Sequence, residues 1–213
     1  MTSLSLVSTL ILASSLALAQ NGGDEFHHHN FDVSVGPAIP LGNATNYLNT
    51  APFVGFGYGY RLNRLFQADA GFQVAFGAAN NQNIVLTDAG TLQGGDHEYM
   101  IPLGGRIIIP QPFHRVEVSA GGGTVYLHYS ETAPSGGGYY GATTCYSCTS
   151  RGGWGGYGLA NISYFLDSNH TFRVGTTLQY IAGSTSGQAV ANFPATNTTD
   201  HWLSVGFEFG LSF

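Results

Sequence analysis

The sequence predicts an all-β fold, namely an eight-stranded antiparallel up-and-down transmembrane β-barrel. Three observations lead to this prediction: segments in which every second residue is large and apolar, connections that alternate between short and long, and a composition poor in charge. Charged residues make up 8% of the chain, against about 25% in a typical soluble domain. Lysine is absent, aromatic residues reach 13%, and 31 of the 213 residues are glycine. This composition suits a barrel that faces lipid outside and carries small or polar residues inside.

The chain begins with a segment typical of a secretory signal peptide. Residues 4–19 are apolar and rich in serine and threonine, and they end in Ala-Leu-Ala, although no Lys or Arg precedes them. The pattern predicts a signal peptide over residues 1–19, a polar periplasmic leader over 20–30 and a barrel over 31–213. No later segment reaches the roughly 18 apolar residues of a spanning helix, so a membrane crossing requires strands.

Eight segments show the alternation of a strand with one apolar face. They are Phe31–Ile39, Phe53–Leu62, Leu65–Gly77, His97–Ile109, Arg115–Tyr129, Trp154–Leu166, Thr171–Gly183 and Leu203–Phe213. The last is the most regular, and it is as long as the roughly 9–11 residues that a tilted strand needs to cross a bilayer. Two features interrupt the pattern elsewhere. Pro37 indicates a bulge or an end of pairing, and the glycines before Thr124 leave the two faces of the fifth strand undecided beyond Gly123.

The connections between these strands alternate strictly between short and long. The three longest loops are predicted over residues 78–96, 133–153 and 184–199. Short turns on one side and long loops on the other are typical of an outer-membrane barrel, whose turns face the periplasm and whose loops face outside. Both ends of the barrel should therefore lie on the periplasmic side.

Residues 31–213 resemble the small eight-stranded outer-membrane barrel family that includes OmpA-type, OmpX-type and opacity-type proteins. The resemblance rests on Gly-Phe-Gly-Tyr-Gly-Tyr-Arg-Leu-Asn-Arg at 55–64, on the repeated outward aromatic residues and on the terminal Gly-Leu-Ser-Phe. It implies a Gram-negative-type outer membrane and a C-terminal signal, formed by Phe209, Leu211 and Phe213, that the barrel-assembly machinery reads. Such barrels serve as anchors, adhesins, narrow pores and a few lipid enzymes, so the resemblance specifies architecture rather than activity.

Charged side chains in mid-strand positions gather on the predicted inward faces. The six residues are Arg61, Asp69, Arg106, Glu117, Arg173 and Glu208. Side chains fill the interior of an eight-stranded barrel, and an unpaired buried charge is costly, so we expect ion pairs that plug the lumen. The alternative is a water-lined path or a gate of switching pairs, which would make the protein a narrow passive pore for small solutes or ions.

The cysteines and the histidine run are interpreted structurally. Cys145 and Cys148 lie in a predicted exported loop, where thiols are oxidised, so we expect a loop disulfide. His27, His28 and His29 are interpreted as part of a solvated leader, because three adjacent histidines cannot all face one ion without a folded support. We expect neither a metal nor a cofactor.

One pair of residues resembles a catalytic site. His128 and Ser130, followed by Glu131, are similar to the His-activated serine of outer-membrane lipid A deacylases, and residues i and i+2 share a strand face. The flanking residues are not those of that family. We therefore interpret the pair as an interfacial histidine and a loop-edge serine and expect no enzyme, with a lipid A deacylase-like hydrolase as the remote alternative.

These observations predict a monomer with a structural or surface-interaction role through its loops. Its expected partners are outer-membrane lipid, lipopolysaccharide and an unidentified extracellular ligand. The formal charge of −6 gives no basic patch, so nucleic-acid binding is not expected. A soluble periplasmic β-sandwich, which would bury the outward aromatic residues, is the alternative fold. The residues expected in an interfacial girdle are Tyr58, Tyr60, Tyr99, Trp154, Tyr164, Tyr180 and Trp202.

Overall fold

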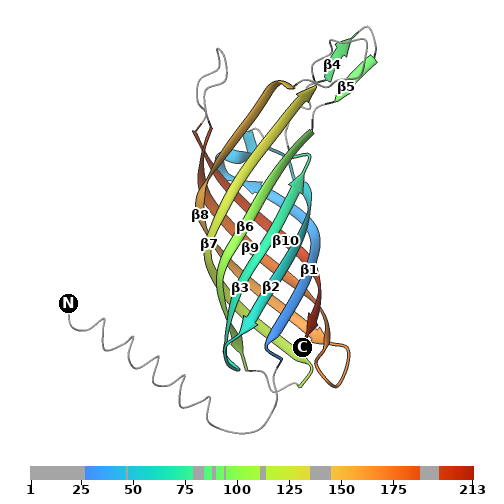
Figure 1. Ribbon diagram of the computed structural model, residues 1–213, viewed down its shortest axis with the longest axis vertical. Helices are drawn as coiled ribbons and strands as arrows, with labels where there is room; N and C mark the ends of the chain where they lie inside the picture. Colours follow the sequence, from blue (N-terminus) through green and yellow to red (C-terminus); the bar gives the residue numbers. More distant parts are fainter. Residues whose placement is uncertain are drawn as a thin grey trace, which may run out of the picture.

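The structure is a closed barrel of eight antiparallel strands (Figure 1). Each barrel strand pairs with the next one along the chain, and the last pairs with the first, in the order β1-β10-β9-β8-β7-β6-β3-β2. The computed structural model describes residues 27–46, 48–78, 84–87, 90–93, 95–110, 114–134, 145–187 and 197–213, with only the backbone for 84–87, 90–93, 131–134 and 145–149. The predicted fold class is therefore confirmed. Within the described residues, no helix is long and apolar enough to cross a membrane.

All eight predicted strands are present, with shifted ends. The barrel strands are β1 His29–Leu41, β2 Ala51–Arg61, β3 Phe66–Phe76, β6 Gly95–Ile109, β7 Val116–Pro134, β8 Cys145–Phe165, β9 Phe172–Gly187 and β10 Asn197–Ser212. A separate hairpin is formed by β4 Ile84–Thr87 and β5 Gly90–Gln93, and a short 3-10 helix, η1 Gly42–Asn46, follows β1.

The alternating apolar residues lie on the outside of the barrel. Phe207 is 59% exposed, whereas the adjacent Glu208 is 3% exposed. Phe56 and Ile162, on other strands, are each 56% exposed. A sandwich would bury such side chains against a second sheet. The closed barrel therefore rules out the β-sandwich alternative and gives the molecule an outer apolar belt.

The strands extend further than the alternation predicts. β7 continues to Pro134 and β8 begins at Cys145, so much of the predicted loop 133–153 is strand. Part of the predicted loop 184–199 likewise belongs to β9 and β10, and the predicted loop 78–96 contains the β4–β5 hairpin. The alternation fades in these extensions because strands that project past an apolar belt have polar surroundings on both faces.

The glycine-rich part of β7 does not shift the register. Pairing with β6 continues from Val118, opposite Ile109, to Thr132, opposite Gly95. The register with β8 shifts only at Ala133/Pro134. Odd-numbered residues of β7 therefore stay inside from Glu117 to Tyr129. The predicted bulge or end of pairing at Pro37 is wrong, because β1 continues to Leu41 with one register to β10 on both sides of the proline. Bridging to β10 is interrupted only locally, since proline has no N–H to donate.

Candidate functional site

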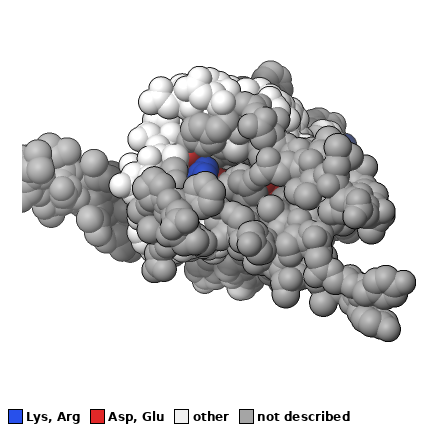
Figure 2. Space-filling model, turned by 90° about the horizontal axis from the view of Figure 1, so that it is seen from above, with Lys and Arg blue, Asp and Glu red and all other residues white. Residues whose placement is uncertain are grey.

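Inward side chains from all eight strands fill the lumen in three layers. From the short-turn end to the long-loop end, these are a network of ion pairs, an apolar layer and a second polar cluster. We call them the lower network, the apolar layer and the upper cluster. Figure 2 looks down the barrel from the long-loop end and shows basic and acidic atoms in the hollow inside the rim.

The lower network contains the six charged residues singled out in the sequence. Their side chains are joined in three pairs: Arg61 Nη2 to Glu117 Oε2 at 2.5 Å, Arg106 Nε to Asp69 Oδ2 at 2.8 Å, and Arg173 Nε to Glu208 Oε1 at 3.5 Å. All six side chains are at most 11% exposed. The alternation positions them, because each stands between outward apolar neighbours on its strand.

Arg173 holds the lower network together. Besides Glu208, its guanidinium lies 3.7 Å from Asp32, measured from Nη2 to Oδ1. Nη1 donates hydrogen bonds to Asn30 Oδ1 at 2.8 Å and to Ser212 Oγ at 3.1 Å. Asp32 is absent from the predicted network, although its inward position follows from the same alternation. Its addition makes four carboxylates against three arginines.

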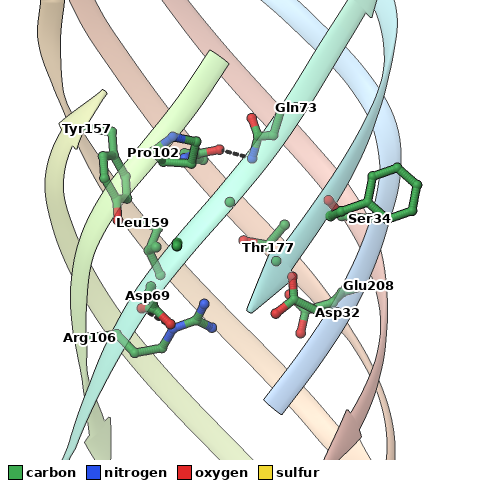
Figure 3. A pocket seen from close by; sticks show the side chains of 15 residues that line it. Asp32, Ser34, Asp69, Gln73, Pro102, Arg106, Tyr157, Leu159, Thr177 and Glu208 are labelled. Atoms are coloured by element: carbon green, nitrogen blue, oxygen red, sulfur yellow. Dashed lines mark hydrogen bonds and ion pairs between the residues drawn. The ribbon is translucent and has the colours of Figure 1, made fainter. Parts of the chain in front are cut away.

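A small polar cavity lies above the lower network (Figure 3). Asp32 and Glu208 lie side by side at its lower end, and Gln73 lies higher up and donates a hydrogen bond to Gln179 Oε1 at 2.5 Å. The cavity of about 50 Å³ has room for roughly three or four water molecules. It is too small for a metabolite.

The apolar layer separates this cavity from the long-loop end of the lumen. Six of its large side chains are at most 2% exposed: Phe53, Met100, Val125, Leu127, Ile181 and Trp202. Ala44 in η1 and Leu48 after it join the same cluster. The prediction that Trp202 faces outward is wrong. Because Leu203 faces outward, the preceding residue of the same strand must face inward.

The upper cluster is centred on Arg151 and Asp200. Arg151 Nη2 lies 3.5 Å from Asp200 Oδ1, and Thr185 Oγ1 donates to Asp200 Oδ2 at 2.5 Å. The guanidinium also lies 4.0 Å from the centre of the Tyr129 ring. The fully buried Glu98 lies near this cluster. Arg151 and Asp200 are absent from the predicted site because they fall within, or at the edge of, segments predicted as loops. Glu98 lies in the predicted strand His97–Ile109, whose alternation could have placed it inside.

The cysteine side chains lie outside the described part of the chain. The backbones of Cys145 and Cys148 belong to β8, and the predicted disulfide stays a prediction.

The three leader histidines contact the short-turn end of the barrel. His27 Nε2 donates a hydrogen bond to Asn169 O at 2.7 Å, and His28 Nδ1 donates one to Arg61 O at 2.9 Å. His29 Nδ1 shares a hydrogen bond with Tyr58 Oη. The described residues contain no group of three or more His, Cys, Asp or Glu residues that could hold a metal ion.

The terminal residues help to close the barrel. Phe213 and His29 exchange backbone hydrogen bonds of 2.8 and 2.9 Å, and the Phe213 ring stacks on Phe31 with 5.7 Å between centroids. Phe209 and Leu211 also lie on the outer face of β10. Their proposed role as an assembly signal stays a prediction.

His128 and Ser130 both point outward from β7, as their spacing predicts. The His128 ring lies against Tyr99 and Tyr126, with centroids 6.2 and 6.5 Å apart. The side chain of Glu131 lies outside the described part. The pair thus faces away from the lumen, at the long-loop end of the apolar belt.

Comparison with known proteins shows likeness at the level of fold. No family model matches the chain, and no curated protein matches it. Neisserial surface protein A (NspA) is 11% identical and superposes with a TM-score of 0.58 over 89% of this chain and 100% of that chain. The N-terminal β-barrel domain of Pseudomonas aeruginosa OprF is 8% identical and superposes with a TM-score of 0.48 over 88% of this chain and 100% of that chain. Ail, the attachment invasion locus protein of Yersinia pestis, is 10% identical and has a TM-score of 0.46 over 87% of this chain and 100% of that chain. The chain thus has the fold of the small eight-stranded outer-membrane β-barrels, as the sequence predicts.

Proposed function

We propose that the protein is a closed, monomeric β-barrel of a bacterial outer membrane that presents its long loops at the cell surface. Its short turns would face the periplasm, and it would reach the membrane by means of the predicted signal peptide and the barrel-assembly machinery. Its role would be structural or one of surface interaction. The single observation that carries this proposal is the outer apolar belt.

The belt fits lipid rather than water. Every Arg, Asp and Glu side chain described on the barrel strands points into the lumen, whereas phenylalanines, leucines and isoleucines surround the outside. Exposed apolar surface costs roughly 25 cal/mol per Å² in water, and soluble monomers rarely expose a continuous apolar surface larger than a few hundred Å². The fold of small outer-membrane barrels and the predicted export signal support the outer membrane as its location.

The contents of the lumen favour a scaffold over a pore. A solute that entered from the long-loop end would meet the apolar layer, with Leu127, Ile181 and Trp202 all at 0% exposure. Below the cavity it would meet the paired charges of the lower network. Chemistry within the barrel is disfavoured for the same reason, since a substrate has no room there. The loops are therefore the parts that can meet a partner.

Surface labelling of intact cells tests this arrangement. An epitope inserted between Gly187 and Asn197, in a long link, should bind antibody on intact cells. The same epitope placed in the β8–β9 turn, between Asp167 and His170, should bind only after the outer membrane is permeabilised. Labelling of the turn but not of the loop on intact cells would show the opposite orientation. Absence of both epitope-bearing variants from the membrane fraction would refute the proposal.

A further inference from the structure

A continuous band of aromatic and histidine rings runs around part of the long-loop edge of the apolar belt. It crosses four neighbouring strands, β3, β6, β7 and β8. Successive ring centroids lie between 5.2 and 6.5 Å apart. We call this the outer band, and its members in order are Phe76, His97, Tyr99, His128, Tyr126 and Trp154.

The outer band offers hydrogen-bond donors, and no carboxylate among the described side chains of its strands shares its face. Imidazole, phenol and indole groups can all donate, and Ser130 adds a hydroxyl directly across from His97. The acids described on these strands face the other way: Asp96 and Glu98 are buried inside the barrel, where Arg151 also lies. The outer face of the band therefore suits an anion.

A glycine on β8 leaves room for two polar groups of the band on the outer face of the barrel. Gly152 on β8 lies opposite His128 on β7. A Cβ atom at Gly152 would lie 2.8 Å from the Tyr126 hydroxyl and 3.4 Å from His128 Nδ1. A side chain at this position would displace the Tyr126 hydroxyl, so the glycine lets both groups lie over the strand. They are two neighbouring polar groups at the long-loop edge of the apolar belt.

Histidines are the only described basic groups on the outward face of this edge. The chain has no lysine, and four of its six arginines point into the lumen. The other two, Arg64 and Arg115, lie at the short turns at the opposite end. Histidine gains a proton in mildly acidic solution, so the charge of this edge depends on pH.

We propose that the outer band binds the phosphate of a lipid head group in the surrounding leaflet, and that protonation of His97 and His128 strengthens this binding. The phosphate would sit beside the Tyr126 hydroxyl and His128 Nδ1, over Gly152. The inference rests on the proposed membrane location and adds to it a head-group preference. A lipid is the matching partner because the band is continuous with the belt, and because Tyr and Trp prefer the head-group level of a bilayer.

The two tryptophans make the band directly measurable. Trp154 belongs to the band and is 61% exposed, whereas Trp202 is buried in the lumen at 0%. Bromine on lipid acyl chains quenches tryptophan fluorescence on contact. We would reconstitute the protein into phosphatidylcholine bilayers that contain an equal mole fraction of either brominated phosphatidylglycerol or brominated phosphatidylcholine. Phosphatidylglycerol keeps one negative charge between pH 5.5 and 8, so a change with pH reports on the protein.

At about pH 5.5 we expect the anionic lipid to quench Trp154 at least about twofold more than the zwitterionic lipid, with the ratio falling toward one at about pH 8. The double variant His97→Gln/His128→Gln should lose the pH-dependent preference. Gly152→Ala, which displaces the Tyr126 hydroxyl, should weaken it. His114→Gln, at the opposite end of the barrel, should leave the preference unchanged. Folding of each variant is checked by its gel mobility without boiling.

Two negative results have different meanings. Equal quenching by both lipids at each pH, or a preference that survives the double histidine variant, would overturn the head-group proposal while leaving Trp154 in contact with lipid. No quenching by either lipid would show that Trp154 does not face a bilayer, which would overturn the proposed function as well. Trp202→Phe provides the same measurement with Trp154 alone, and the wild type serves if that variant does not fold.

Discussion

Arg173 is the residue on which the lower network depends most. It balances Glu208 and Asp32 and donates hydrogen bonds to Asn30 and Ser212. Arg173→Ala would leave two buried carboxylates without their cation, and removal of one member of a buried ion pair costs about 3–5 kcal/mol. Urea unfolding in detergent micelles measures this loss. The control is Arg64→Ala, in an exposed turn, which should change the free energy of unfolding far less. An equal loss of unfolding free energy in the two variants would contradict the account.

Asp167 fixes the turn between β8 and β9. Its Oδ1 accepts hydrogen bonds from the backbone N–H groups of Phe172 at 2.8 Å and Thr171 at 3.0 Å. The Phe172 N–H, above all, holds the pKa of Asp167 below its usual range. A depressed folded-state pKa means that this contribution to stability is present above about pH 4 and is lost as the pH falls through the lowered value.

We predict that backbone amide hydrogens of the β8–β9 turn exchange faster with solvent when the Asp167 carboxylate is absent. Hydrogen exchange at the Phe172 amide should increase in Asp167→Ala at neutral pH, and the wild type should approach the variant in strongly acidic solution. An exchange rate at Phe172 that is identical in the two proteins at neutral pH would show that the side chain does not hold the turn.

At the scale of single residues, the sequence predicts which side chains point into the lumen better than it predicts which residues they contact there. Period-two alternation places the six charged residues inside, but it cannot say which strand lies opposite which at a given height. The pairing of Arg61 with Glu117 depends on the register around the barrel. Trp202 shows the opposite error, because an indole ring suggests an interfacial outward position, whereas its place one residue before the outward Leu203 directs it inward.

β10 provides a test of the belt at the scale of one strand. Phe207 lies midway along its outward face, whereas Thr199 lies near the long-loop end of the same face. An arginine on the lipid face costs about 2–4 kcal/mol at the bilayer midplane and about 0–1 kcal/mol near an interface. We expect Phe207→Arg to lose the larger amount and Thr199→Arg the smaller. Equilibrium refolding into lipid vesicles measures both, and similar costs would place the belt elsewhere.

Element boundaries show where sequence patterns stop being informative. β2 and β3 lie close to their predicted ends because both lie within the apolar belt, where large apolar residues alternate with inward ones. β7 and β8 extend beyond it, and the sequences of these extensions contain serine, threonine and glycine in place of regularly alternating apolar residues. The β4–β5 hairpin has only four residues in each strand, too few for a period to be recognised. The alternation therefore predicts the belt-facing parts of strands and not the projecting parts.

For the whole molecule, the apolar layer predicts an electrically silent barrel. It closes the lumen with side chains that water does not wet, so wild-type protein should give no current steps in planar bilayers. Replacing Leu127, Ile181 and Trp202 together by serine would remove most of that barrier and should admit ions past the lower network. Regular steps from the wild type would restore the pore alternative. Silence of the triple variant would show that the lower network closes the barrel by itself.

The architecture as a whole was predictable because each level of the sequence agrees with the others: strand period, link lengths and an outward face without charge. The apolar layer was not predictable in the same way. Its members come from different strands and stand on inward faces that are otherwise polar, so the pattern of any one strand conceals them. Val125 and Leu127 mark the point where the inward face of β7 changes from polar to apolar.

The most direct test of a closed membrane barrel is the gel mobility of membrane-extracted protein with and without boiling. We predict a compact, fast-migrating band in the unboiled sample that shifts on boiling, because the barrel resists detergent until heat opens it. Removal of Phe213, which pairs with His29 across the closing seam, should reduce or delay formation of the compact band. Protein recovered in the soluble periplasmic fraction, with no shift on boiling, would contradict the account.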